Sequence, residues 1–369
     1  MFNFRKKRIC VALSGGVDSS VAAYLLKKQG HDVFGVFVRG YNVDGCQDKE
    51  AYDARHVAQI LGIPFYVLDL EDEYYKRIVQ YMLDGYAKGI TPNPDVACNS
   101  EIKFGLLYEA AMKLGADAVA SGHYARVERV HRTWNIEHGT EKNYCLREGN
   151  DGNKDQSYFL WQIPYERFSK ILFPIGKLKK SRVRMIAKKA GLFTATKKDS
   201  QGVCFLGKFS FVDFLKQHIP YGQGDVVDMQ GVIIGKHDGV LLYTVGQRHG
   251  FNNNAGHEMF VVKRNLEENK LIVAPEGDRA LFCEKFYATQ LNFLDADFKK
   301  QLEDGKEIKI LARVRYRQPL FRARVSMKDR KLTIIPNVKN QYKLFPAQGQ
   351  SVVFYTKKGV VLGGAIISG

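Results

Sequence analysis

The stretch Ser14-Gly15-Gly16-Val17-Asp18-Ser19-Ser20 decides the fold of the first part of this chain. The apolar run 9–13 leads into it and predicts a buried strand, and apolar residues at helical spacing follow it as far as Gly30, where we expect the helix to end. A strand, a Gly-Gly turn and a helix form an anion site, because glycines let the backbone approach the anion and unpaired N–H groups of the helix point at it. The alternative is an ordinary strand-to-helix turn with a serine cap.

The turn lacks the lysine of the Walker pattern, which disfavours a generic P-loop NTPase. Asp18 instead stands where a carboxylate could hold Mg²⁺ bound to phosphate. The whole string resembles the pyrophosphatase loop (PP-loop) of enzymes that activate a substrate by adenylation and release pyrophosphate. This resemblance implies ATP as the cofactor.

Strand and helix patterns alternate through the first 120 residues. We expect strands over 31–38, 64–70 and 117–120, and helices over 49–61, 71–88 and 101–114. This alternation predicts an α/β domain with a parallel sheet, in which ligands bind beyond the carboxyl ends of the strands. The loop 14–19, Val38 and Gly122 should therefore converge on one nucleotide.

The later chain changes character twice. Residues 126–152 are irregular and polar, which indicates a hairpin or an insertion. The pattern of 177–191 predicts a basic helix. Lysines at its N-terminus oppose the helix dipole unless an anion lies nearby. Beyond Gly222 the pattern is β, and 283–368 predicts a small β-barrel or sandwich. We expect a PP-loop domain over 1–165 that also includes about 192–208, a small central RNA-binding domain over 166–280 and a C-terminal β-barrel over 281–369.

The chain of 369 residues carries a formal net charge of +17. Residues 161–200 contain eleven Lys/Arg against two Asp/Glu, and 313–331 contain eight against one. Two basic segments far apart in the sequence indicate two contact surfaces for a polyanion, with a solvated face or an anionic membrane surface as alternatives. Interleaved Tyr316, Gln318 and Phe321 favour nucleic acid.

Neither the composition nor the first residues indicate a membrane or secreted protein. No stretch reaches the length of a transmembrane helix, and residues 1–7 lack the apolar core of a signal peptide, so we expect a cytoplasmic protein that binds no membrane. The six cysteines are scattered without a CxxC pair, which fits neither a disulfide scaffold nor a zinc ribbon, and we expect no metal held by cysteines.

The loop 91–99 (TPNPDVACN) carries the first candidate for catalysis. Its two prolines stiffen an extended segment that leads into a helix, so Cys98 would lie near a helix N-terminus, where a thiolate is stabilised. Asp95 could act as an acid or base, or could hydrogen-bond a substrate amide. The alternative is a buried structural cysteine.

A second cysteine loop, 198–206 (KDSQGVCFL), places Cys204 close to several lysines that would favour a thiolate. Adenylation makes a carbonyl oxygen a leaving group that sulfur can replace. One thiol can carry that sulfur as a persulfide, while the other attacks to release it and becomes disulfide-linked. The role of Cys46 stays open.

The chain as a whole resembles the bacterial tRNA-specific 2-thiouridylase family. The resemblance rests on SGGVDSS, TPNPDVACN followed by EIKF, GHYAR, KDQSYFL, DSQGVCFLG, YTVGQRHG, VRYRQ and GQSVVFY, spread from residue 12 to about 364. It implies ATP-dependent 2-thiolation of the wobble uridine (U34) of tRNA, with release of AMP and pyrophosphate. It also implies a sulfur donor, either a cysteine desulfurase or a sulfur-carrier protein.

The resemblance further implies a role for individual residues. Cys98 would be the nucleophile, Cys204 the persulfide-bearing cysteine, and Asp95 a third catalytic group. The residues implied for ATP are Ala12, Leu13, Ser14, Gly15, Gly16, Val17, Asp18, Ser19, Val38 and Gly122, with Leu13 standing where Met is usual. Those implied for tRNA are Asn93, Pro94 and Asp95 on the target uridine, and His123, Lys154, Asp155, Gln156, Arg315, Tyr316 and Gln350 elsewhere.

Two other functions compete with this hypothesis. The same loop serves amidotransferases and ligases that use ammonia or an amine, in which case both cysteines would be structural. An RNA-binding scaffold with a vestigial nucleotide fold is disfavoured by the intact loop 14–19. For Gln247-Arg248-His249 we expect a domain-packing or RNA-facing role.

Overall fold

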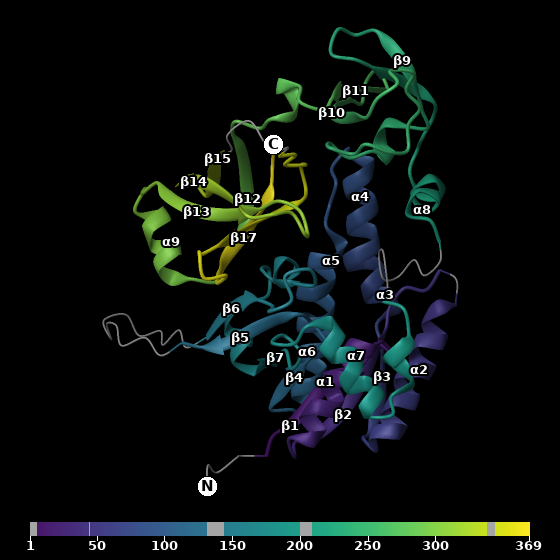
Figure 1. The fold of residues 1–369 in the computed structure, drawn as a ribbon, viewed down its shortest axis with the longest axis vertical. Coiled ribbons are helices and arrows are strands. Elements are labelled where there is room, and N and C mark those ends of the chain that lie inside the picture. Colours follow the sequence, from purple (N-terminus) through teal and green to yellow (C-terminus); the bar gives the residue numbers. More distant parts are fainter. Residues whose placement is uncertain (1–5, 44, 131–143, 200–208, 338–343) are drawn as a thin grey trace.

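A five-stranded parallel sheet forms the centre of the first part of the chain (Figure 1). The computed structural model describes residues 6–43, 45–130, 144–199, 209–337 and 344–369. The sheet has the strand order β3-β2-β1-β4-β7. Its strands are β1 (Arg8–Ala12), β2 (Asp32–Arg39), β3 (Phe65–Asp69), β4 (Ala118–Ala120) and β7 (Ile171–Leu172). The prediction of an α/β domain with a parallel sheet is confirmed.

Helices cover both faces of this sheet. Ile9 and Val11 of β1 face α1 (Val17–Lys28), α2 (Cys46–Leu61) and α7 (Lys180–Lys189), and Cys10 between them belongs to the core on the opposite face. Alternate side chains of a strand point to opposite faces, so a strand buried on both sides is apolar throughout. This explains the continuous apolar run that precedes the Gly-Gly turn.

Residues 166–191 lie with the first sheet, although we expected them in the central domain, whereas 192–199 were expected with the PP-loop domain. β7 pairs with β4 in parallel, and Val183 of α7 packs in the same core as α1. A two-residue strand has no sequence period of its own, so this addition to the sheet left no pattern to detect.

Two predicted helices differ in detail from the structure. The run expected at 71–88 contains α3 (Glu71–Tyr74), the π-helix η1 (Tyr75–Gln80) and α4 (Tyr81–Ala87). The helix expected to start at 101 begins earlier, as α5 (Pro94–Ala97), and continues through the π-helix η2 (Cys98–Leu106) into α6 (Leu107–Lys113). The early start has a local cause, because the Asn93 side chain accepts a hydrogen bond from Val96 N and proline follows it.

The hairpin alternative for 126–152 agrees with the structure. β5 (Ala125–Arg129) and β6 (Tyr144–Glu148) pair antiparallel. Short 3₁₀ helices occur elsewhere in the chain, at η4 (Ser157–Phe159), η5 (Tyr165–Lys170), η6 (Phe193–Thr196), η7 (Val240–Leu242) and η8 (Arg279–Leu281).

The central part is a small β structure at the far end of α4 (Figure 1). Its sheet has the order β10-β11-β8-β9, and α8 (Phe211–His218) precedes it. The strands are β8 (Gly224–Val227), β9 (Ile233–His237), β10 (Met259–Asn265) and β11 (Lys270–Pro275). Met82 of α4 packs with Phe214 and Val261, so this part shares a core with the helix that carries it.

The C-terminal part is a closed six-stranded barrel, which decides between the two β architectures that the sequence allowed. Around it run β12 (Phe286–Phe293), β15 (Lys331–Pro336), β14 (Phe321–Lys328), β13 (Ile308–Arg313), β16 (Ser351–Tyr355) and β17 (Val361–Ile367). Phe298 and Leu302 of α9 (Ala296–Glu303) pack into the barrel core.

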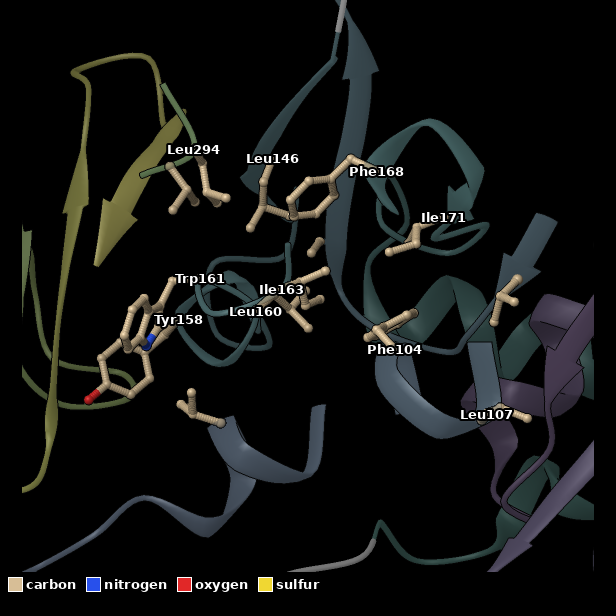
Figure 2. Packing of buried hydrophobic residues seen from close by; sticks show 14 of the residues in the cluster. Phe104, Leu107, Leu146, Tyr158, Leu160, Trp161, Ile163, Phe168, Ile171 and Leu294 are labelled. Carbon is tan, nitrogen blue, oxygen red and sulfur yellow. The ribbon is translucent and has the colours of Figure 1, made fainter. Parts of the chain in front are cut away.

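A buried aromatic cluster joins the barrel to the first part of the chain (Figure 2). Figure 2 shows Trp161 and Tyr158 beside the strands of the barrel, with Ile163 between them and Phe104 of the parallel-sheet domain. Trp161 lies against Gly364 of β17 so closely that a Cβ there would be 2.5 Å from its Cδ2 atom. The contact therefore requires glycine at this position of the barrel.

Across the described residues, every helix is too short or too polar to cross a membrane.

Candidate active site

The Gly-Gly turn leaves the N-terminus of α1 open. Gly16 is the N-cap residue, and no side chain caps the helix. Ser19 Oγ turns back instead, accepting a hydrogen bond from Ser14 N at 3.2 Å and donating one to Gly16 O at 3.2 Å. The alternative of a serine-capped turn is therefore wrong. An uncapped helix N-terminus presents backbone N–H groups that suit an anion.

Three neighbouring strands bring the expected nucleotide residues to one edge of the sheet. In register, Ala12 of β1 pairs with Val36, two residues before Val38, and Val11 pairs with Ala120, two residues before Gly122. Gly122 lies against the turn, because a Cβ on it would be 2.6 Å from Ser19 N. A larger residue at 122 would push into the first turn of α1.

Asp18 is held by two side chains from other elements. Tyr124 Oη donates to its carboxylate at 2.8 Å, and Lys180 Nζ lies 2.7 Å from its Oδ2 atom. Burial and the charge of Asp18 raise the pKa of Tyr124, so its hydroxyl stays protonated and remains a donor. The Asp18 side chain is 31% exposed, which leaves part of the carboxylate open to solvent.

A second carboxylate near Asp18, that of Asp199, forms ion pairs with three cationic side chains. Its oxygens lie 2.7 Å from Lys154 Nζ, 2.8 Å from Lys180 Nζ and 2.7 Å from the Arg184 guanidinium. Although burial opposes it, hydrogen bonds from Lys154 and Lys180 lower the pKa of Asp199 to about 2. Through Lys180, Asp199 thus connects the segment that leads to the second cysteine loop with Asp18 at the Gly-Gly turn. Cys204 itself lies outside the described residues.

The loop at 91–93 is fixed to the C-terminal barrel by Gln350. Gln350 Nε2 donates to Thr91 O at 3.0 Å and to Pro92 O at 3.1 Å, and its Oε1 accepts from Asn93 Nδ2 at 3.4 Å. Thr91 N also donates to Gln348 O at 2.9 Å. The barrel therefore sets the position of the segment that precedes Asp95 and Cys98.

Asp95 and Cys98 lie within the first two turns of the helix that starts at Pro94. Burial raises the pKa of Asp95, and the positive charge of Lys103 opposes this shift. Cys98 is 4% exposed and packs with Tyr74 and Ile78. We expected Cys98 at a helix terminus, but the helix begins four residues earlier, and the field of a helix dipole weakens beyond the first turn.

Three family models together match nearly the whole chain. They are described as a tRNA methyl transferase HUP domain for residues 7–208, a tRNA methyl transferase PRC-barrel domain for 212–275 and an aminomethyltransferase beta-barrel domain for 283–367. The tRNA-specific 2-thiouridylase MnmA of Bacillus subtilis is 44% identical over 374 residues, which cover 97% of this chain and 94% of that protein. The protein of the same name from Listeria monocytogenes serovar 1/2a is 42% identical over 366 residues, covering 98% and 94%.

The chain belongs to the tRNA-specific 2-thiouridylase family. This confirms the resemblance found in its motifs, and it makes the protein an enzyme of the sulfurtransferase class. The first domain accordingly has the PP-loop fold of this family.

The residues that the family resemblance assigned to tRNA contact mostly bind other parts of the protein. His123 is buried against Phe104 and Phe173, and its Nδ1 lies 2.6 Å from Ser121 Oγ. Burial and then Lys103 lower the pKa of His123 well below its usual range. The imidazole is therefore neutral at physiological pH and lies in the protein interior.

The side chains of the tripeptide 154–156 contact three residues that lie far apart in the sequence. Lys154 pairs with Asp199, as described above. Asp155 is 3% exposed, and its carboxylate accepts a hydrogen bond from Arg313 of the barrel at 3.1 Å. Gln156 Oε1 accepts one from Tyr124 N at 3.0 Å, next to the tyrosine that holds Asp18. All three side chains are thus engaged within the protein.

Arg315 and Tyr316 lie where the barrel meets the other two parts. Arg315 donates to Val245 O of the central part and lies 5.7 Å from the centre of the Phe345 ring. The Tyr316 ring is 4.6 Å from that of Phe159. Both residues contribute to the contacts between domains, and both remain partly exposed.

The turn at 247–249 belongs to the same junction. Gln247 Oε1 accepts from Thr244 N at 3.1 Å, and the Thr244 hydroxyl lies 3.2 Å from that of Thr91. Arg248 forms an exposed ion pair with Glu258. These contacts agree with the domain-packing role that we considered for this turn.

Sequence reasoning missed Lys180 and Arg313 as parts of the site. The sequence did indicate a partner for Lys180. A lysine at the start of a helix opposes the helix dipole and is stabilised there by a nearby anion. That anion is Asp18. Arg313 left no local signal, since its partner lies 158 positions away in the sequence.

Proposed function

We propose that this protein catalyses ATP-dependent 2-thiolation of the wobble uridine (U34) of tRNA. The observation that carries the proposal is the uncapped N-terminus of α1 at the edge of a parallel sheet, with Asp18 beside it. The relatives named as tRNA-specific 2-thiouridylases support tRNA as the substrate. The exposed cationic residues within 161–200 and 313–331 supply charge for binding its phosphates.

The geometry fits a nucleoside triphosphate at the turn. The open helix N-terminus and the close approach of Gly122 leave backbone N–H groups available to phosphate. Asp18, with its partly exposed carboxylate, would hold Mg²⁺, which when bound offsets the negative charge of the phosphates. Ala12, Val38 and Gly122 would border the nucleotide, as their positions at one sheet edge suggest.

The reaction would then proceed in three steps. The 2-oxygen of uridine attacks the α-phosphorus of ATP, pyrophosphate leaves, and the oxygen becomes part of an AMP leaving group. The terminal sulfur of a persulfide on Cys204 attacks C2, and AMP departs. The Cys98 thiolate then attacks the Sγ atom of Cys204 in the C2–S–S–Cys204 adduct. The S–S bond breaks, the outer sulfur stays on C2, and the two cysteines become joined in a disulfide. A thiol reductant and a sulfur donor, a cysteine desulfurase or a sulfur carrier, reset the enzyme.

Asp95 would act on the uridine in this scheme. Its raised pKa favours a protonated carboxyl group at a higher pH than usual, and such a group can donate to a carbonyl oxygen or exchange a proton with the base. Asn93 and Pro94 would hold the flipped-out uridine beside it, in a loop that Gln350 keeps in position. The burial of Cys98 implies that binding of the RNA must open its surroundings before the last step.

The test separates activation of the base from delivery of sulfur. Cys98→Ser and Cys204→Ser variants are incubated with tRNA, ATP and a persulfide donor, and pyrophosphate release and the mass of the U34 nucleoside are measured. We expect pyrophosphate release without thiolated product from both. Asp18→Ala should lose pyrophosphate release as well. Full thiolation by either cysteine variant contradicts the two-cysteine mechanism.

A second candidate function has one observation in its favour. The burial of Cys98 in an apolar cluster also fits a structural cysteine, as in a ligase that delivers ammonia or an amine to an adenylated base. Such an enzyme would keep its turnover in both cysteine variants. The nucleoside mass distinguishes an exchange of oxygen for sulfur from a gained amine, and also from the added methyl group that the family models' description suggests.

A further inference from the structure

Lys180 is a largely buried cation at an electrostatically unfavourable position. It is the first residue of α7, where the helix dipole is positive, and its side chain is only 13% exposed. Two carboxylates stabilise its ammonium group, with Asp18 at 2.7 Å and Asp199 at 2.8 Å. A third, Asp151, accepts a hydrogen bond from the backbone N–H of Lys180 at 2.8 Å. The chain thus uses several acids to keep one lysine beside the Gly-Gly turn.

Stability alone is a weak reason for such a pair. Removing two charges from water costs much of what their attraction returns, and well-packed apolar residues often serve as well. The Asp18–Lys180 pair also bridges α1 and α7, which already pack through Val21 and Val183 in a common apolar core. A ligand held by the lysine would account for its place beside the turn.

The partner of Lys180 is the residue that the proposed function assigns to Mg²⁺. A carboxylate that becomes a ligand to a divalent cation attracts a nearby ammonium group less strongly, because the metal neutralises its charge. Asp199 would still hold Lys180 beside the turn, since that ion pair does not involve Asp18. The ammonium would then face the negative charges that arrive with the metal, which are the phosphates.

We propose that Lys180 binds the pyrophosphate portion of ATP, exchanging its ion pair with Asp18 for one with phosphate when Asp18 takes up Mg²⁺. This inference rests on the proposed use of ATP at the 14–19 turn. Lys180 then stabilises the group that leaves when the uridine is adenylated. It replaces, from a different helix, the lysine that the Walker pattern would supply within the loop. Before ATP binds, the same lysine keeps Asp18 paired.

Binding measurements on the full chain test the exchange. Calorimetric titrations with Mg²⁺ and a non-hydrolysable ATP analogue, with Mg²⁺ and inorganic pyrophosphate, and with AMP are made on the wild type and on Lys180→Met. We expect the dissociation constants of the ATP analogue and of pyrophosphate to rise about tenfold or more, as for the loss of one charge-assisted contact. The affinity for AMP should change less than about twofold. Equal weakening of all three ligands, or no weakening of the ATP analogue, overturns the inference.

Two further variants separate ligand binding from a structural role. Lys179→Met is the matched control, because it removes the same charge from the neighbouring exposed residue, and it should bind all three ligands as the wild type does. Lys180→Met leaves Asp18 without its cation, so Asp18→Asn and Asp18→Asn/Lys180→Met are compared as well. If Lys180 contacts pyrophosphate, the double variant binds it more weakly than Asp18→Asn does. If Lys180 only neutralises Asp18, the two bind it equally and the inference fails.

The same titrations keep the inference apart from the function it rests on. A wild-type protein that binds no ATP analogue contradicts the proposed function. A wild type that binds the analogue, together with a Lys180→Met variant that binds it equally well, contradicts only the role of Lys180.

Discussion

The guanidinium of Arg313, on the C-terminal barrel, donates to the buried carboxylate of Asp155 at 3.1 Å. A second nitrogen of the same group donates to Glu148 at 3.0 Å. Asp155 also accepts hydrogen bonds from Gly149 N and Ser157 N, so several donors hold its carboxylate in position. The network joins the barrel to the tripeptide 154–156, in which Lys154 pairs with Asp199 and Gln156 accepts a hydrogen bond from Tyr124 N.

Removal of the Arg313 guanidinium should destabilise the protein strongly. Arg313→Leu leaves Asp155 as an uncompensated charge in the interior, which costs about 3–5 kcal/mol in systems of this kind. The free energy of unfolding, measured in urea, gives the loss. Arg324→Leu is the matched control, because Arg324 forms an exposed ion pair with Glu307 on the same barrel and its loss should cost less than about 1 kcal/mol. Equal losses in the two variants would contradict the view that the Asp155 network is buried.

Gln350→Ala should impair catalysis more than tRNA binding. The substitution removes the bonds to Thr91 O and Pro92 O that position the loop before Asp95. Small displacements of a catalytic group reduce rates on the order of ten- to a hundredfold. We therefore expect a fall in kcat for thiolation of that order, measured by steady-state assay. The exposed Gln301→Ala on α9 is the control and should retain activity. A purely RNA-binding role for Gln350 would instead raise KM at an unchanged kcat.

Cys98 should react slowly with thiol reagents until RNA is present. Its side chain is 4% exposed, whereas Cys283 is partly exposed. Labelling with iodoacetamide followed by peptide mass spectrometry should show Cys98 modified at least about tenfold more slowly than Cys283, because labelling requires local opening. Addition of tRNA and an ATP analogue should accelerate labelling at Cys98. The core residue Cys10, whose pKa burial raises to about 12, should stay the least reactive in both conditions. Rapid labelling of Cys98 without RNA would show that the cluster around it is open.

His123 should make the protein less stable in mild acid. Burial and Lys103 lower the pKa of His123 well below its usual range, so the folded state holds it neutral while the unfolded chain can protonate it. Its contribution is fully present above the unfolded pKa of about 6.5 and is lost as the pH falls below that value. The melting temperature of His123→Gln should accordingly depend less on pH between about 4 and 6.5 than that of the wild type. His249→Gln, at an exposed turn, is the matched control for loss of an imidazole.

The sequence predicted well what depends on local pattern. The turn 14–20, the parallel sheet and the β character of the last 87 residues follow from residue period and glycine placement (369 − 283 + 1 = 87). Asparagine followed by proline, as at 93–94, is a common helix start and indicates the observed start at Pro94. The apolar period of 101–114 alone indicates a later start.

The contacts between domains could not be predicted from the sequence. The partners of Asp155, Gln350 and Arg315 lie on other domains, far away in the chain. Charge and motif marked these residues as important, yet the same signals serve RNA contact and ion pairs within the protein. Only the fold shows which side chains are already paired, and Asp155 is among them. Whether Lys154, Gln156, Arg315, Tyr316 and Gln350 also contact RNA stays a prediction.

The contact between Trp161 and Gly364 bears on how the chain is made. Trp161 is synthesised 203 residues before Gly364, the glycine that covers it (364 − 161 = 203). At about 5–20 residues per second, roughly 10–40 seconds pass during which a nascent PP-loop domain exposes the Trp161 side chain. A chain that ends before β17 would leave this surface open permanently. Truncated products of this gene should therefore engage chaperones or aggregate, even though they contain the whole PP-loop domain.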